Sequence, residues 1–312
     1  MSDSLITIIM TAYNSEQTIE KSIKSVLKQL YPIYELIIVD DGSTDRTKEI
    51  CCKYVGEKVK LLEKENGGPS SARNMALKFA KGKYICFLDS DDTYESCFLE
   101  TMVENIKQDY DMCICPYYIC KNKIKKEPQI LFAKLTSNQA MLEVLRNESL
   151  GGFLWNKIFI REIIVLNKII FNENVYVCED LLFVEEYLHY CKNIKVLDIP
   201  MYNYFMTENS ISRTLSPKKI SMLNSFLDMW NFSVDREYKE IVAKRFIEQF
   251  LSFYGRLDYD RKYILELYSK IRSLVKEENI SIYRCLNLRT RLKYFIFIIS
   301  PQFFLKIYRL LG

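Results

Sequence analysis

The chain has 312 residues, and its 49% of apolar side chains is ample for one large domain or two smaller ones. That apolar content argues against a disordered chain, and only 9 Gly and 7 Pro exclude collagen-like and low-complexity structure. With a single His, any proton transfer in this protein is expected to rely on carboxylates. We expect the ten Cys to be reduced thiols of a cytoplasmic protein, because the N-terminal residues do not resemble a secretory signal.

The net charge of +4 hides an uneven distribution along the chain. Residues 1–210 contain 25 basic and 30 acidic side chains, whereas residues 211–312 contain 19 basic and 10 acidic ones. From Asn279 onward there are six basic residues and no acidic residue. A segment of this kind is expected to meet a negatively charged partner.

The first part of the chain alternates between short apolar runs and amphipathic stretches. The apolar runs predict strands at residues 5–10, 36–39, 59–62, 84–88 and 112–115. The amphipathic stretches predict helices at residues 19–30, 47–54, 70–80 and 97–107. Repeated units of this length predict an α/β fold with a mostly parallel sheet flanked by helices.

The pattern changes near residue 136. The segments expected there are a helix at 137–146, an irregular stretch at 151–162, a helix after Cys178, and short strands at 195–197 and 202–205. Beyond Ser216 the chain is expected to be almost wholly helical, with Pro301 interrupting the last helix. The sequence therefore predicts two regions, residues 1–213 and residues 214–312.

Acidic side chains cluster where the second and fourth expected strands end. The segment VDDGSTD contains Asp40, Asp41 and Asp45, and the segment FLDSDD contains Asp89, Asp91 and Asp92. Parallel sheets bind ligands at the carboxyl ends of their strands, and gathered carboxylates need a cation or hydrogen-bond donors nearby. Two carboxylates one residue apart suit a hard divalent ion. The alternative is an acidic turn whose Asp caps a helix.

Between these clusters lies the segment NGGPSSARNMAL, residues 66–77. Its two glycines allow close approach of the backbone, and Ser70 and Ser71 can cap the following helix. Arg73 is then in the first turn of that helix, where the N-terminus favours anions, so its guanidinium suits a diphosphate. The alternative is a glycine-containing turn followed by a surface Arg.

Five segments in this order, TAYN, VDDGSTD, NGGPSSARN, FLDSDD and CEDLLF, resemble the family 2 glycosyltransferases with the GT-A fold. The resemblance covers residues 4–213. It implies a Rossmann-like, nucleotide-sugar-binding catalytic domain over residues 1–213, followed by a helical C-terminal region over residues 214–312. It also implies inverting transfer of a sugar, with a UDP-sugar as donor, to an acceptor hydroxyl with the help of Mg²⁺ or Mn²⁺.

Carried over residue by residue, the resemblance implies a site. The residues expected at the nucleotide-sugar are Thr11, Ala12, Tyr13, Asp41, Arg73, Asp89 and Ser90. Asp91, the second acid of the family's Asp-x-Asp pair, is expected to hold the metal, and Asp180 to take the proton of the acceptor hydroxyl. The residues expected on the acceptor side are Asp92, Trp155 and Glu179.

Two of these assignments have structural alternatives. A Trp at position 155 is as often part of a core, and Asp180 is also the kind of acid that a helix start favours. Residues 202–212 lack the His or basic residue that relatives often have near the phosphates, which leaves Ser210, Ser212 and Arg213 for that role.

The expected acceptor is a carbohydrate, such as a lipid-linked oligosaccharide for a surface polysaccharide at the cytoplasmic face. The alternatives are a protein acceptor, a teichoic-acid-like polymer, or a catalytically silent nucleotide-sugar-binding partner subunit. The Gln-x-x-Arg-Trp motif of processive polysaccharide synthases does not occur, which favours a single addition per encounter. Nucleic acid is not an expected partner, because the aromatic residues form no recognisable module.

Residues 284–312 combine the basic residues with the apolar runs 294–299 and 303–305. These runs are too short to span a bilayer, but they suit a peripheral position on an anionic membrane surface. The alternative is a terminal helix that packs on the domain or forms a homo-oligomer.

Overall fold

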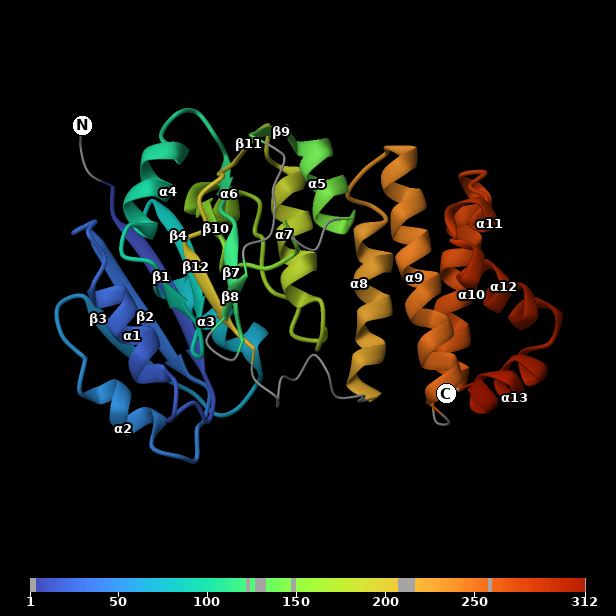
Figure 1. The fold of residues 1–312 in the computed structure, drawn as a ribbon, viewed down its shortest axis with the longest axis horizontal. Coiled ribbons are helices and arrows are strands. Elements are labelled where there is room, and N and C mark those ends of the chain that lie inside the picture. Colours follow the sequence, from blue (N-terminus) through green and yellow to red (C-terminus); the bar gives the residue numbers. More distant parts are fainter. Residues whose placement is uncertain are drawn as a thin grey trace. The chain divides into compact units, whose positions relative to one another are not determined.

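The computed structural model describes residues 4–121, 124–126, 133–146, 150–206, 217–257 and 260–311. The chain divides into two compact units (Figure 1). The first contains the described residues of 4–173 and 179–206, and the second contains Asn174–Cys178 and the described residues from 217 onward. The boundary expected between residues 213 and 214 lies outside the described residues.

An eight-stranded sheet forms the centre of the first unit, with the strand order β3-β2-β1-β4-β10-β6-β11-β9. The strands are β1 (Ile6–Ala12), β2 (Tyr34–Asp40), β3 (Val59–Glu63), β4 (Tyr84–Asp89), β6 (Met112–Ile114), β9 (Lys134–Thr136), β10 (Lys157–Ile160) and β11 (Asn193–Val196). The four strands β3, β2, β1 and β4 are parallel neighbours, drawn in blue to cyan in Figure 1. The predicted mostly parallel sheet is therefore confirmed.

Helices connect and flank these strands. They are α1 (Ile19–Leu27), α2 (Thr47–Cys52), α3 (Pro69–Phe79), α4 (Phe98–Ile106), α5 (Ser137–Arg146), α6 (Arg161–Leu166) and α7 (Glu179–His189). Ile19, Ile23 and Val26 of α1 are fully buried in the core that also contains Ile6 and Ile8 of β1. Their spacing of four and three residues places them on one face of the helix, which accounts for this packing.

A second, four-stranded sheet has the order β5-β12-β7-β8. Its strands are β5 (Thr93–Tyr94), β7 (Tyr117–Lys121), β8 (Ile124–Lys126) and β12 (Tyr202–Phe205). The strand β5 begins directly after the acidic turn that follows β4, and it pairs with β12. This pairing ties the acidic turn to a segment more than 100 residues later in the chain.

The stretch 151–162, expected to be irregular, contains the strand β10 and the start of α6. The strand β10 lies antiparallel between β4 and β6 in the middle of the large sheet. Ile158 and Phe159 are fully buried there. The prediction was wrong because the apolar run of β10, Ile158–Ile160, has only three residues and follows the polar Asn156 and Lys157. Its strand conformation comes from pairing with two distant neighbours.

The second unit is helical in its described part beyond residue 216, as predicted. Its elements are the 3₁₀ helix η2 (Pro217–Ile220) and the α-helices α8 (Ser221–Met229), α9 (Arg236–Arg256), α10 (Arg261–Glu277), α11 (Ile282–Cys285), α12 (Leu288–Ile299) and α13 (Pro301–Leu311). Phe250 of α9 stacks on Tyr268 of α10 at 4.6 Å between ring centroids. Pro301 begins α13, which confirms the predicted interruption. Within the described residues, no helix combines the length and apolarity needed to cross a membrane.

Candidate active site

The register of the large sheet brings the ends of three strands together. Thr11 of β1 pairs with Asp89 of β4, and Ala12 pairs with Asp40 of β2. The backbone N–H of Asp41 donates to the carbonyl of Ala12 at 2.9 Å. Both acidic clusters therefore lie at one edge of the sheet, beside the half-exposed Tyr13.

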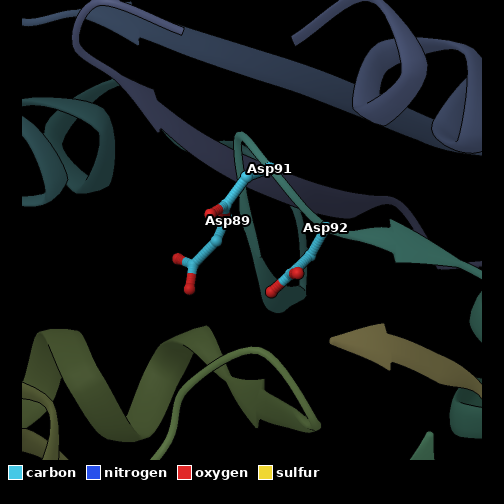
Figure 2. A group of neighbouring side chains, drawn as sticks. All are labelled: Asp89, Asp91 and Asp92. Atoms are coloured by element: carbon cyan, nitrogen blue, oxygen red, sulfur yellow. The ribbon is translucent and has the colours of Figure 1, made fainter. Parts of the chain in front are cut away.

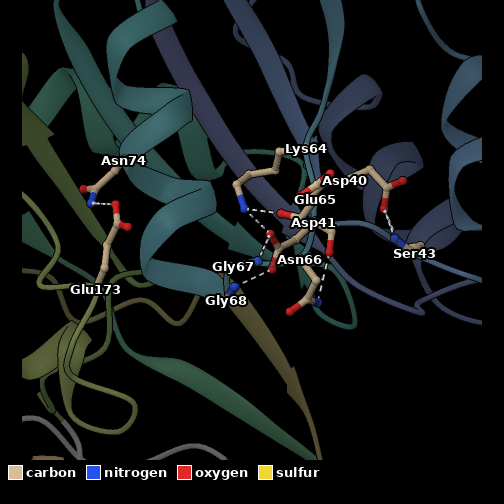
Figure 3. Close-up of polar contacts among 10 residues, drawn as sticks. All are labelled: Asp40, Asp41, Ser43, Lys64, Glu65, Asn66, Gly67, Gly68, Asn74 and Glu173. Atoms are coloured by element: carbon tan, nitrogen blue, oxygen red, sulfur yellow. Dashed lines mark hydrogen bonds and ion pairs between the residues drawn. The ribbon is translucent and has the colours of Figure 1, made fainter.

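Asp41 is buried, and its carboxylate accepts several hydrogen bonds at the start of α3 (Figure 3). The donors are Lys64 Nζ at 2.7 Å and the backbone N–H groups of Gly67 at 3.0 Å and Gly68 at 2.8 Å. The N-terminus of α3, which the sequence suggested for a diphosphate, is thus occupied by a carboxylate of the protein itself. No motif in the sequence pointed to Lys64.

The other two acids of the VDDGSTD segment bond to nearby backbone. Asp40 accepts from the N–H and the hydroxyl of Ser43. Asp45 accepts from the N–H of Thr47 at 2.9 Å, at the start of α2. Asp45 therefore acts as a helix-capping acid, which is the alternative considered for this cluster from the sequence.

The second acidic cluster forms the turn between β4 and β5 (Figure 2). Carboxylate oxygens of Asp89, Asp91 and Asp92 all lie within 4.8 Å of one another. Asp92 is fully buried and accepts from the hydroxyl of Tyr202 at 2.6 Å and the N–H of Phe205 at 2.7 Å. Both oxygens of Asp92 thus link the turn to β12, which leaves Asp89 and Asp91 as the carboxylates available to a ligand.

Burial raises the pKa of Asp89 to about 6, and the neighbouring carboxylates of Asp91 and Glu179 add to the rise while Arg73 opposes it. Burial also raises the pKa of Asp91. A divalent cation would neutralise the negative charge of carboxylates gathered in this way. Their oxygens are also the hard donors that Mg²⁺ and Mn²⁺ prefer. Asp89 and Asp91 therefore fit a Mg²⁺ or Mn²⁺ ion chemically.

Ser90 lies between these two acids and holds the turn in place. Its hydroxyl lies 2.8 Å from that of Ser15, in the loop after β1, and its carbonyl accepts from Ser22 of α1. In this structure its hydrogen bonds are therefore with neighbouring segments of the same sheet edge.

Arg73 of α3 joins the acidic turn to α7. Its Nη1 lies 2.6 Å from Asp180 Oδ1 and 3.1 Å from Glu179 Oε1, and its Nη2 lies 3.8 Å from Asp89 Oδ1. Burial opposes the guanidinium charge, but the carboxylates of Asp180 and Glu179 more than offset it, so the pKa of Arg73 is raised. The guanidinium that was expected to contact a diphosphate thus forms ion pairs with carboxylates of the protein in this structure.

Burial raises the pKa of Asp180 well above the usual range, and Glu179 and Asp89 add to the effect while Arg73 opposes it. A carboxyl of this kind binds a proton more readily than an exposed one, which suits a residue that must accept a proton. Asp180 and the acidic turn are electrostatically linked through Arg73.

Replacing Arg73 is expected to destabilise the fold. Arg73→Met would leave the carboxylates of Asp180 and Glu179 without their cation, and we expect the free energy of unfolding to fall by about 3 kcal/mol. Urea denaturation measures this change. Arg46→Met is the matched control, because the ion pair of Arg46 with Glu16 is exposed and should contribute little. Equal stability of the two variants would contradict the expectation.

The loop of residues 150–156 lies against the first turn of α7. Lys157 is fully buried, and its Nζ donates to the carbonyls of Leu150 at 3.0 Å, Gly151 at 2.8 Å and Phe153 at 2.7 Å. The ammonium is therefore bound to the backbone of this loop and holds its shape.

Gly152 in this loop leaves no room for a side chain. A Cβ at Gly152 would lie 2.7 Å from the Cα of Leu181, the residue that follows Asp180. Gly152→Ala is expected to displace the start of α7, to lower the free energy of unfolding by about 1–3 kcal/mol, and to reduce activity. Thermal unfolding and turnover measure the two effects. Gly56→Ala is the control, because nothing lies within 4 Å of its added Cβ; similar behaviour of both variants would show that this contact is unimportant.

Trp155 lies in the core and is 3% exposed. Its ring stacks on Tyr202 at 4.2 Å and on Phe153 at 4.8 Å between centroids. Trp155 is therefore a core residue, which is the alternative that the sequence left open. Ser210, Ser212 and Arg213 lie outside the described residues.

A comparison with protein families bears on this geometry. The model of the family described as Glycosyl transferase family 2 matches residues 7–165, which are 159 of the 312 residues. The chain belongs to glycosyl transferase family 2. The match includes both acidic clusters and Arg73.

Two curated proteins illustrate the similarity. UDP-Glc:alpha-D-GlcNAc-diphosphoundecaprenol beta-1,3-glucosyltransferase WfgD of Escherichia coli is 39% identical over 145 residues, which are 44% of this chain and 57% of WfgD. Poly(ribitol-phosphate) beta-N-acetylglucosaminyltransferase TarP of Staphylococcus aureus is 31% identical over 241 residues, which are 76% of this chain and 72% of TarP. The match to WfgD thus spans less than two thirds of that protein.

The fold resembles that of a solved structure. The crystal structure of S. aureus TarS residues 1–349 in complex with UDP-GlcNAc matches with a TM-score of 0.76 and 22% identity, over 97% of this chain and 89% of that one. This likeness supports the GT-A fold class predicted for the chain.

Proposed function

We propose that the protein is an inverting glycosyltransferase that moves a sugar from a UDP-sugar to an acceptor hydroxyl, with Asp180 as the general base. The main support is the position of Arg73. Its guanidinium contacts Asp180 and reaches toward Asp89, so the proposed base and the acidic turn belong to one site. A merely structural acid at a helix start would not need this link to the edge of the sheet.

The donor would be bound at the edge where β1, β2 and β4 end. Thr11, Ala12 and Tyr13 would line the nucleobase pocket, with Asp41 as the acceptor for the base. Asp41 is already held by Lys64 and the start of α3, so it would receive the nucleobase in a preset position. UDP as the nucleotide is supported by the UDP-GlcNAc complex of TarS and by UDP-Glc, the donor in the name of WfgD.

Asp89 and Asp91 would hold the divalent ion, Asp91 as the direct ligand. A bound Mg²⁺ or Mn²⁺ supplies charge neutralisation for the diphosphate leaving group. The buried carboxylates provide the negative site for it, and Asp92 keeps the turn in shape through Tyr202 and Phe205.

Asp180 would take the proton from the acceptor hydroxyl as its oxygen attacks the anomeric carbon. The attack comes from the face opposite the diphosphate, so the new C–O bond forms as the bond to UDP breaks and the configuration inverts. Arg73 holds the carboxylate of Asp180 in a fixed orientation, and Glu179 shares the same guanidinium. UDP departs with the electron pair of the broken bond, and Asp180 later releases the proton to water.

The acceptor is proposed to be a lipid-linked oligosaccharide, since WfgD acts on a diphosphoundecaprenol-linked sugar. The acceptor in the name of TarP, poly(ribitol-phosphate), supports a teichoic-acid-like polymer as the alternative. A nucleotide-sugar-binding subunit without activity would have no need for an ordered Asp180.

The proposed function is tested by measuring release of UDP. The full chain is incubated with Mn²⁺ and with UDP-Glc, UDP-Gal, UDP-GlcNAc or UDP-GalNAc, with and without a synthetic lipid-diphosphate-linked GlcNAc. We expect one donor to release UDP faster when the acceptor is present. Absence of UDP release with every donor and of divalent-dependent UDP binding by calorimetry would overturn the proposal.

A further inference from the structure

Helix α12 has two apolar faces. One face is buried within the helical unit: Phe297 packs against Phe250 with 4.9 Å between centroids, and the hydroxyl of Tyr294 lies 2.9 Å from that of Tyr268. The other face is exposed. Four of the large side chains exposed on α12, here called the α12 stripe, are Leu288 (82% exposed), Leu292 (61%), Phe295 (50%) and Ile299 (65%).

The spacing of the α12 stripe is four, three and four residues, so these side chains follow one line along the helix. The buried Tyr294 and Phe297 occupy the other side, which means that the stripe is not part of the core. Phe303, at the start of α13, is also half-exposed. A continuous exposed apolar surface of this kind is characteristic of an interaction site.

Basic side chains lie beside the α12 stripe. Arg289 and Arg291 both lie between Leu288 and Leu292 in the sequence and are exposed, as is Arg284 in α11. No Asp or Glu follows Glu278 in the sequence. The surface around the stripe therefore combines apolar side chains with positive charge and lacks acidic groups from its own helices.

We propose that α12 lies flat on an anionic lipid membrane, with the α12 stripe among the acyl chains and the flanking arginines at the lipid phosphates. Twelve residues of helix extend only about 18 Å, too short to cross a hydrocarbon layer of about 30 Å. An apolar line bordered by cations is the pattern of helices that bind in the interface.

The charge pattern favours a membrane over a second copy of the chain. In a two-fold symmetric contact the same patch meets itself, so the arginines of one copy would face those of the other. Anionic headgroups instead neutralise them. The proposal concerns the helical unit alone and does not depend on the reaction proposed for the first unit.

Sedimentation with lipid vesicles tests the proposal on the full chain without donor or acceptor. The vesicles contain either phosphatidylcholine alone or phosphatidylcholine with about 30% phosphatidylglycerol, which gives them a negative surface charge like that of an anionic cell membrane. We expect binding to be at least about ten-fold stronger with the anionic lipid. The double substitution Leu292→Ser and Phe295→Ser should weaken vesicle binding at least about ten-fold, because it removes apolar side chains that the membrane would bury. Equal binding to both kinds of vesicle, or none to either, would overturn the proposal.

The matched control is Leu166→Ser with Ile170→Ser, which removes two side chains of similar exposure (71% and 65%) from the first unit. This control should bind vesicles as the unchanged protein does. Arg284→Gln with Arg289→Gln should weaken binding to anionic vesicles by about five-fold for each charge removed. Thermal unfolding confirms that each variant is folded, as expected for changes at exposed positions.

Sedimentation velocity tests the alternative that a second copy of the chain covers the α12 stripe. We expect the unchanged protein and the α12 stripe variant to have the same oligomeric state. If the stripe variant binds vesicles as well as its control does, or if it converts an oligomer into monomers, a membrane is not what covers this face.

Discussion

Asp180→Asn is expected to lower the rate of sugar transfer by about 10²- to 10⁴-fold and to leave the affinity for UDP almost unchanged. The amide has the shape of the carboxylate but does not accept the proton of the acceptor hydroxyl. The loss should therefore appear in kcat at saturating acceptor, with little change in the KM for the donor. UDP release in the presence of acceptor measures kcat, and calorimetry measures UDP binding.

Glu179→Gln is the matched control for this experiment. It makes the same change of charge one residue earlier, and Glu179 contacts the same Nη1 of Arg73. We expect this variant to keep activity within about ten-fold of the unchanged protein, below the usual effect of losing a general base. If both variants kept activity close to that of the unchanged protein, Asp180 would not be the base. An equal large loss in both would point to Arg73 as the important partner.

Asp91→Asn is expected to remove the dependence of UDP binding on Mn²⁺ and to lower turnover by about 10³-fold. Asp92 uses both of its oxygens within the protein, so a cation at this turn depends mainly on Asp89 and Asp91. Titration calorimetry with UDP, in the presence and absence of Mn²⁺, measures the effect directly.

Asp109→Asn serves as the control for that substitution. Asp109 is exposed and has a positive φ of 71°, a conformation that Asn also adopts readily. This variant should bind UDP with the same divalent dependence as the unchanged protein. If Asp91→Asn also retained it, the metal-binding role of this turn would be refuted.

Local sequence patterns were sufficient for much of the fold. The apolar runs that became β1, β2 and β4 lie between amphipathic helices, so their type and order follow from periodicity and from the rules of βα connection. The acidic clusters could be placed at one edge for the same reason, because the carboxyl ends of parallel strands meet there. The strand β10 was missed, since its four residues become a strand only through pairing with β4 and β6.

The sequence by itself determined the fold class, the family resemblance and the identity of the carboxylates, because each is encoded in short segments with their own spacing. Only the tertiary structure decided which partners these groups have. It joined Arg73 to Asp180 across 107 residues, placed Lys64 on Asp41, and buried Trp155 among aromatic rings. It also showed that α12 has one buried and one exposed apolar face. Such contacts depend on how distant elements pack, and no local pattern encodes that packing.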